Sequence, residues 1–89
     1  MESRWAIIFK AFANRNRLKI VNLLGAGQVL NVSQISRELK ISVKSTSKHL
    51  SILRGLEVLE YVGKHGHVLY AMNPHLPHDI YMVTRLFIH

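Results

Sequence analysis

Lysine and small hydroxyl side chains gather in one stretch of the chain, from Val43 to Arg54. If this stretch is a helix, one arc of its wheel carries Val43, Thr46, Leu50 and Leu53. The other side then carries Lys44, Ser45 and Lys48, with His49 and Ser51 at its flanks. Lysines can reach a phosphate or a guanine, and short hydroxyls can bond to base edges or to the DNA backbone. The stretch predicts either a helix that enters a major groove or an amphipathic helix whose charged face is only hydrated.

The charge of the chain favours a polyanionic partner. Its 89 residues include 12 Lys and Arg but only 5 Asp and Glu, for a formal net charge of +7 with the 6 His neutral. This excess is typical of proteins that bind nucleic acid or an acidic membrane surface, although some small proteins simply have a solvated basic surface. No apolar run approaches a membrane span and the first residues lack the layout of a secretory signal. We therefore expect a cytoplasmic protein with no membrane partner.

Several kinds of chemistry are excluded by what the sequence lacks. The chain has no cysteine, which excludes disulfides, thiolate metal sites and cysteine nucleophiles. Acidic residues are few, and no phosphate-binding loop, HExxH or GxSxG motif accompanies the histidines. We expect a protein that is not an enzyme and that uses no cofactor.

Four helices are predicted before the end of the lysine-bearing stretch. The first places four large apolar side chains on one face, namely Trp5, Ile8, Phe9 and Phe12. Asn14 can cap a second helix, which Gly25 and Gly27 end. Ser33 can cap a third, short helix, and Ser42 can cap the lysine-bearing helix itself.

After Arg54 the hydrophobic period changes from that of a helix to that of a strand. Two β-branched and aromatic runs, residues 58–62 and 67–72, flank the segment from Gly63 to Gly66. This pattern predicts a hairpin with a four-residue loop and a basic tip. Pro77 fits the first turn of a last helix, which is apolar almost all round as far as Ile88.

The order of these elements is α-α-α-α-β-β-α, a mainly helical fold with a two-stranded hairpin. It predicts a single winged helix-turn-helix domain over residues 1–89. In that fold the third helix lies across the DNA backbone, the helix from Val43 to Arg54 enters the groove, and the hairpin tip, or wing, lies over phosphate. The two elements expected to face DNA contain four basic residues, namely Lys44, Lys48, Arg54 and Lys64. Their position favours the DNA-binding interpretation.

Three stretches of the chain resemble the ArsR family of bacterial and archaeal repressors. They are residues 9–20, residues 31–39 and residues 41–54, and the last contains the pattern Ser47-x-His49-Leu50. The resemblance implies a homodimeric winged-helix repressor of double-stranded DNA whose two terminal helices pack across the two-fold axis. On the recognition helix it implies DNA contacts by Ser45, Thr46, Ser47, Lys48 and His49, and on the wing tip by Lys64 and His65. The His49 imidazole has two interpretations, a bond to phosphate or a bond that caps local structure.

The chain departs from the family pattern at two places. Family members usually follow the recognition helix with Arg-Glu-Ala-Gly-Leu-Val, whereas this chain has Arg-Gly-Leu-Glu-Val-Leu from Arg54 to Leu59. Its glycine comes two residues early, so we expect an earlier helix end or another angle of the wing. Metal-sensing members often carry a Cys-Val-Cys pattern on the third helix, and here thiolate sensing is excluded.

The two terminal helices present more apolar area than the other elements can cover. We expect this area to form a symmetric dimer interface made of Trp5, Ile8, Phe9, Phe12, Ile80, Val83, Leu86 and Phe87. The alternative function is a winged helix that binds RNA or another protein without operator specificity, since a fold alone does not fix function.

A metal site is not expected, although the spacing of His78 and His89 makes them candidate metal ligands. Some ArsR relatives bind zinc at the dimer interface through the last helix, and His78 and His89 keep the histidine spacing of that pattern. The pattern's aspartate position is Leu76, and its final glutamate falls beyond His89. Two imidazoles alone make an incomplete tetrahedral site unless Asp79 or His75 adds a ligand. The favoured interpretation is therefore a regulator that needs no metal, with its effector unidentified.

Overall fold

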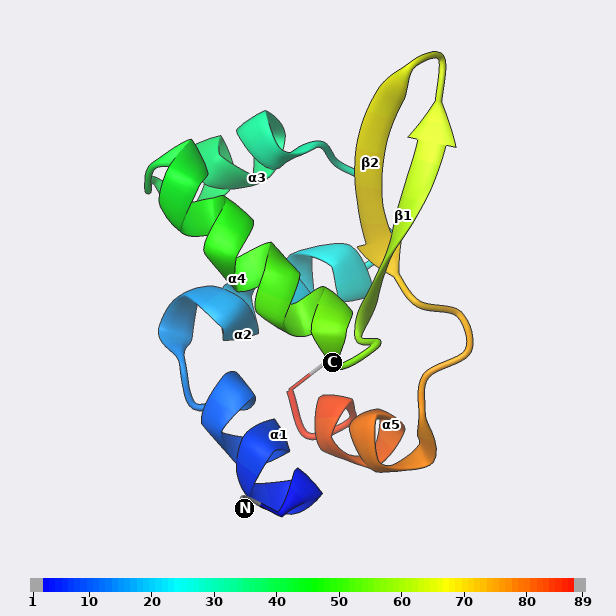
Figure 1. Ribbon diagram of the computed structural model, residues 1–89. Helices are drawn as coiled ribbons and strands as arrows, with labels where there is room; N and C mark the ends of the chain where they lie inside the picture. Colours follow the sequence, from blue (N-terminus) through cyan, green and yellow to red (C-terminus); the bar gives the residue numbers. More distant parts are fainter. Residues whose placement is uncertain (1–2, 88–89) are drawn as a thin grey trace.

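The computed structural model describes residues 3–87, which form five helices and one two-stranded antiparallel sheet (Figure 1). In chain order the elements are α1 (Arg4–Phe12), α2 (Arg15–Gly25), α3 (Val32–Leu39), α4 (Val43–Gly55), β1 (Leu59–Lys64), β2 (His67–Met72) and α5 (His78–Thr84). The order confirms the predicted mainly helical fold with a hairpin. Within residues 3–87 no helix is both long and apolar enough to cross a membrane.

Polar side chains cap the first four helices, as the sequence predicts for two of them. The side chain of Asn14 accepts a hydrogen bond from the backbone of Arg17 at the start of α2, and Ser42 accepts one from Ser45 at the start of α4. The prediction that Ser33 caps α3 is wrong. Its cap is Asn31, which forms a reciprocal capping box with Gln34, so the helix starts before Ser33. Two side-chain bonds satisfy two orphan backbone groups there, whereas a serine cap would satisfy one.

A left-handed residue ends α4 where the family pattern has glycine. Glu57 has φ 62°, its backbone N–H bonds to the Arg54 carbonyl, and the N–H of Val58 bonds to the Leu53 carbonyl. These two bonds form a Schellman motif, whose left-handed position is normally glycine. Gly55 is the last residue of α4, one residue beyond the predicted end. The early glycine therefore leaves a glutamate in the strained position and does not end the helix sooner.

The wing is a tighter hairpin than the sequence predicts. Lys64 pairs with His67, so the turn between the strands contains only His65 and Gly66. Both have positive φ, 51° and 77°, which is the type I′ geometry that matches the twist of a hairpin. A further bridge joins Leu30 to Tyr70 of β2 and fastens the base of the wing to the segment before α3.

The core lies between α4 and the helices around it. Its fully buried side chains include Ile20 and Leu24 of α2, Ile35 of α3, and Leu50 and Leu53 of α4. Val43 was expected on this buried side but is exposed, because Thr46, Leu50 and Leu53 fill that face of α4 one turn further on.

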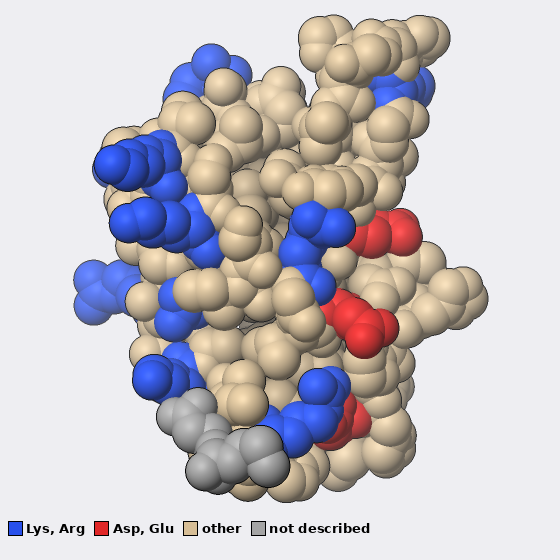
Figure 2. All heavy atoms as spheres, in the orientation of Figure 1, with Lys and Arg blue, Asp and Glu red and all other residues tan. Residues whose placement is uncertain are grey.

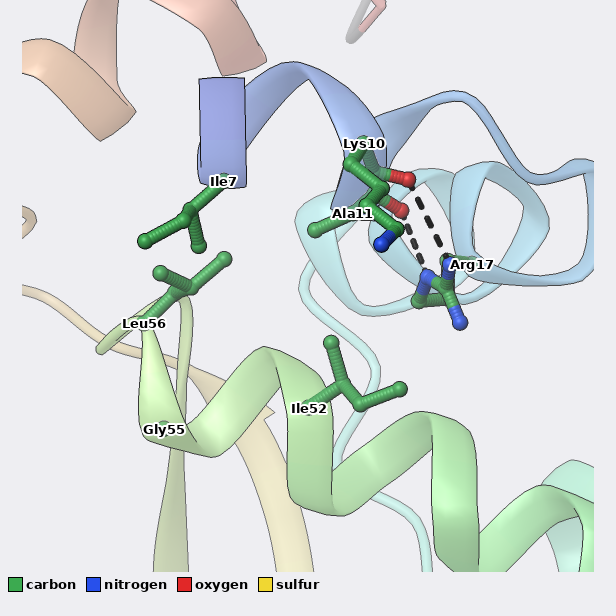
Figure 3. Close-up of a pocket in the computed structure, with 7 residues that line it drawn as sticks. All are labelled: Ile7, Lys10, Ala11, Arg17, Ile52, Gly55 and Leu56. Carbon is green, nitrogen blue, oxygen red and sulfur yellow. Dashed lines mark hydrogen bonds between the residues drawn. The ribbon is translucent and has the colours of Figure 1, made fainter. Parts of the chain in front are cut away.

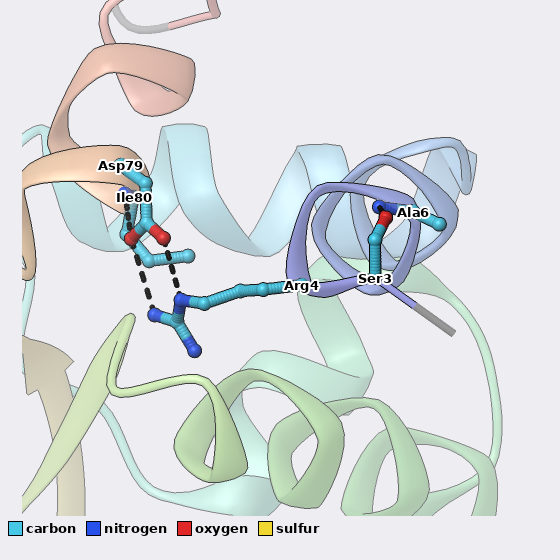
Figure 4. A network of polar contacts seen from close by, with 5 residues as sticks. All are labelled: Ser3, Arg4, Ala6, Asp79 and Ile80. Atoms are coloured by element: carbon cyan, nitrogen blue, oxygen red, sulfur yellow. Dashed lines mark hydrogen bonds and ion pairs between the residues drawn. The ribbon is translucent and has the colours of Figure 1, made fainter. Parts of the chain in front are cut away.

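The terminal helices α1 and α5 lie side by side at one end of the molecule (Figure 1). Arg4 of α1 forms a two-pronged ion pair with Asp79 of α5 (Figure 4), and Phe12 stacks on Phe87 at a centroid distance of 5.9 Å. This packing corrects half of the expected dimer surface. Four of its residues are buried in the protomer core, namely Ile8, Phe12, Ile80 and Val83.

The last helix is shorter than predicted. It begins after Pro77, which serves as its N-cap and not as part of its first turn, and it ends at Thr84. Ile88 lies outside the described residues. Trp5, Phe9 and Leu86 stay exposed, and Phe87 is partly buried.

Candidate nucleic-acid interface

One face of α4 carries the side chains suited to DNA. The residues along it are exposed, namely Lys44, Ser45, Ser47, Lys48 and Ser51. Ile52 joins Lys44, Ser47, Lys48 and Ser51 in lining a shallow groove along this face. The side chain of Ser42 accepts a hydrogen bond from the backbone N–H of Ser45 and so fixes the first turn of the helix, which carries Lys44. Short side chains between two lysines allow a phosphate backbone or a base edge to approach closely.

Thr46 does not belong to this face. Its side chain is fully buried, and its hydroxyl donates to the backbone carbonyl of Ser42 over 2.8 Å. Helical spacing predicts Thr46 among the apolar residues, whereas the family resemblance implies a DNA contact. The structure corrects the second assignment, because a side chain locked under the helix cannot reach a groove.

His49 is held by an arginine from another helix. Nη1 of Arg17 lies 3.1 Å from Nδ1 of the His49 ring. Because arginine only donates hydrogen bonds, Nδ1 accepts and the ring proton sits on Nε2. Partial burial, together with the charge of Arg17, lowers the pKa of His49 below its usual value. The imidazole is therefore neutral at pH 7 and acts in local structure, one of its two interpretations, with Nε2–H left as a donor.

Arg17, the partner of His49, is a residue of the site that the sequence does not predict. Its guanidinium also donates to the carbonyls of Lys10 and Ala11, which end α1. It thus joins α1, α2 and the recognition helix α4. The available signal was an arginine three residues after the Asn14 cap, just beyond the end of the preceding helix.

Arg54 lies at the other end of α4, against the wing. Its guanidinium carbon is 3.4 Å from the ring centroid of Tyr61 in β1, and Tyr61 meets Tyr70 of β2 edge to face. A guanidinium over an aromatic ring is attracted by the ring's electrons and keeps its edge free for other acceptors. Arg54 remains exposed, so it links the recognition helix to the wing while presenting its charge outward.

The wing tip presents Lys64 and His65 to solvent. Between the tip and the start of α3 lies a small concavity lined by Val29, Asn31, Gln34, Lys64, His65, His67 and Leu69. The predicted tip residues are thus brought to one end of the hairpin, but they do not touch the recognition helix.

The charges on the face shown in Figure 2 are unevenly distributed. On this face, Lys and Arg side chains spread along the side where α3 and α4 lie, whereas the acidic side chains in view lie toward β1 and α5 (Figure 2). This asymmetry places the positive potential over the elements that would meet DNA.

The residues weighed for a metal are not assembled into a site within the described part of the chain. Across residues 3–87 there is no group of three His, Cys, Asp or Glu side chains close enough to hold an ion. His78 is exposed at the start of α5, and His89 lies outside the described residues.

Comparison with known proteins matches this geometry. The sequence model of the family described as "Bacterial regulatory protein, arsR family" covers residues 14–61, which include α3 and all of α4. Transcriptional repressor SdpR of Bacillus subtilis (strain 168) is 35% identical over 66 residues, which are 74% of this chain and 72% of SdpR. The family match thus contains the whole candidate recognition helix.

Solved structures agree with the fold. The transcriptional repressor PagR of Bacillus anthracis superposes with a TM-score of 0.71 at 33% identity, covering 91% of this chain and 88% of PagR. The homodimeric winged helix-turn-helix DNA-binding domain of Mb0332 from Mycobacterium bovis superposes with a TM-score of 0.73 at 22% identity, covering 97% of this chain and 82% of that domain. The family match over more than half of the sequence and the relationship to SdpR together show that the chain belongs to the ArsR family of bacterial regulatory proteins and has its winged helix-turn-helix fold.

Proposed function

We propose that the protein is a sequence-specific repressor that binds double-stranded DNA as a homodimer in the cytoplasm. The observation that carries the proposal is the exposed face of α4, with Lys44 and Lys48 among three serines and no acidic residue. The names of SdpR and PagR support repression, since both are transcriptional repressors. The role is binding and not catalysis.

The proposed DNA contacts come from two elements. On α4, contacts to bases and phosphates in the major groove come from Lys44, Ser45, Ser47 and Lys48. At the flank of the helix, His49 donates through Nε2–H and Arg54 adds its charge. Lys64 and His65 of the wing contact phosphate beside it. Most such contacts in protein–DNA complexes are made to phosphate, and they fix the register from which a few side chains read the bases.

The proposed dimer interface is the exposed apolar surface of α1 and α5. Trp5 and Phe9 stack at 5.7 Å in α1, and Tyr81, Met82 and Leu86 are exposed on or directly after α5. A monomer would leave these large side chains in water, whereas a symmetric interface covers them. The Mb0332 domain, which has the same fold, is homodimeric. The single domain thus uses its terminal helices for dimerisation.

Selection of bound fragments from genomic DNA, followed by footprinting, tests the proposal. A two-fold dimer presents two recognition helices, so we expect a pseudo-palindromic site with half-sites separated by about one turn of DNA, roughly 10 base pairs. Single-stranded RNA competitor is expected to leave the complex intact. A bound site that has no two-fold symmetry would contradict the proposal. So would an RNA competitor that displaces the bound DNA at a lower concentration than competing duplex does.

A further inference from the structure

An apolar pocket lies between the C-terminal halves of α1 and α4 (Figure 3). Its volume is about 330 Å³, which is within the range of about 300 to 1,000 Å³ found for small-molecule sites. Ile7 of α1, Ile52 of α4 and Leu56 at the end of α4 point toward one another across it (Figure 3). Ile7 and Ile52 are 40% and 42% exposed, so these walls are apolar surfaces left in contact with water.

One end of the pocket is positively charged. Lys10 and Arg17 line it together with Ala11, and none of the described residues that line it is acidic. The described contacts of Arg17 use three of its five N–H groups, toward Lys10, Ala11 and His49. A guanidinium with donors to spare at the edge of an apolar wall suits a carboxylate, which it can bind through charge-assisted hydrogen bonds.

Gly55, at the end of α4, is among the residues that line the pocket, and it is exposed. An added Cβ at this position meets no atom within 4 Å, and the residue is helical with no positive φ. A larger side chain is therefore accommodated there without displacing the backbone, and it extends along the pocket.

We propose that this pocket binds a small amphipathic carboxylate. Its apolar part lies between Ile7, Ile52 and Leu56, and its carboxylate lies beside Arg17 and Lys10. This arrangement gives the pocket a preference for acids over neutral molecules of the same shape. The pocket shares Ile52 with the groove along the proposed DNA face, and its occupancy is measurable on the protein without DNA.

Titration with naphthalene-1-acetate and with 2-(1-naphthyl)ethanol tests the head group, because the two probes share their rings. Calorimetry together with amide chemical-shift mapping gives the affinity and the location. We expect a Kd on the order of 100 μM for the acid. Binding of the alcohol is expected to be about tenfold weaker. Shifts are expected at Ala11, Ile52 and Gly55.

Two substitutions at one position test the location. Gly55→Leu places a bulky side chain at the lining of the pocket and is expected to weaken acid binding at least tenfold, whereas Gly55→Ala is expected to leave it unchanged. Thermal unfolding of both variants checks the fold, and Ile7→Glu, on the exposed wall, replaces Gly55→Leu if that variant fails to fold. Equal binding of acid and alcohol would overturn the proposal, as would undiminished binding to the filled pocket or shifts confined to Trp5 and Phe9.

Discussion

Glu57 shows how one residue can cost stability at the junction of two elements. It adopts the left-handed conformation at the end of α4, where its backbone bonds to Arg54 and Asn73. We expect Glu57→Gly to raise the free energy of unfolding by about 1 kcal/mol relative to Glu57→Ala, since both variants lose the carboxylate but only glycine relieves the positive φ. Urea denaturation measures the difference. An alanine variant as stable as the glycine variant would show that the backbone is not strained.

His49 makes stability depend on pH. Its pKa is lowered in the folded protein, so the unfolded chain binds a proton more readily than the native one. Its contribution is complete above the usual histidine pKa of about 6.5 and is lost as the pH falls from there toward the lowered folded value. We expect the wild type to lose more stability between pH 7 and 5 than His49→Asn, whose amide oxygen offers Arg17 an acceptor without titrating. Equal losses would contradict the contact between Arg17 and His49.

At the scale of elements, the wing is a hairpin that extends beyond the core. Its residues from Gly63 to Val68 are exposed, and Leu30 fastens only its base. Gly66 has φ 77° in the turn, whereas Gly63 sits in β1 without a positive φ, and neither site would crowd an added Cβ. We expect Gly66→Ala to lower hydrogen-exchange protection in the wing but not in α4, and Gly63→Ala to change it little. Equal effects of the two substitutions would show that the turn geometry does not control the wing.

Local chemistry in the sequence predicts the elements well. Asn14 and Ser42 begin their helices as expected, because a capping side chain bonds only to the backbone of the turn that directly follows it. The start of α3 was misplaced because Asn31 and Gln34 satisfy two backbone groups together and outcompete Ser33. The predicted hairpin loop is two residues too long, because Gly63 and Lys64 belong to β1 and pair with β2. Register depends on pairing across the strands and not on where glycines fall.

The candidate site was predictable only in part, since contacts between distant segments leave no local pattern. Helical spacing identifies Lys44 and Lys48 as outward residues, and it also indicates that Thr46 is buried. The bond from Arg17 to His49 spans 32 residues, and no periodicity reveals it. Likewise, an apolar excess in the terminal helices does not say that Ile8 and Ile80 belong to the protomer core while Phe9 faces outward.

At the scale of the whole molecule, we expect a dimer through α1 and α5. Phe9→Asp places a charge in the proposed interface and is expected to give a monomer by sedimentation at micromolar concentration, because burying an unpaired charge is costly. Val68→Asp is the matched control: Phe9 and Val68 are both 55% exposed, but Val68 lies on the wing. A dimer that survives Phe9→Asp, or one that Val68→Asp dissociates, would place the interface elsewhere.

The salt dependence of duplex binding tests whether α4 is the helix that enters the DNA groove. Anisotropy titrations at several salt concentrations compare the wild type with Lys44→Ala, Lys48→Ala and Arg85→Ala, the last removing an exposed charge after α5. We predict weaker binding for each lysine variant, with the slope of log affinity against log salt reduced by about one unit per lysine. Arg85→Ala is predicted to keep the wild-type slope. Unchanged affinity and slope in the two lysine variants, with native thermal transitions, would contradict the account.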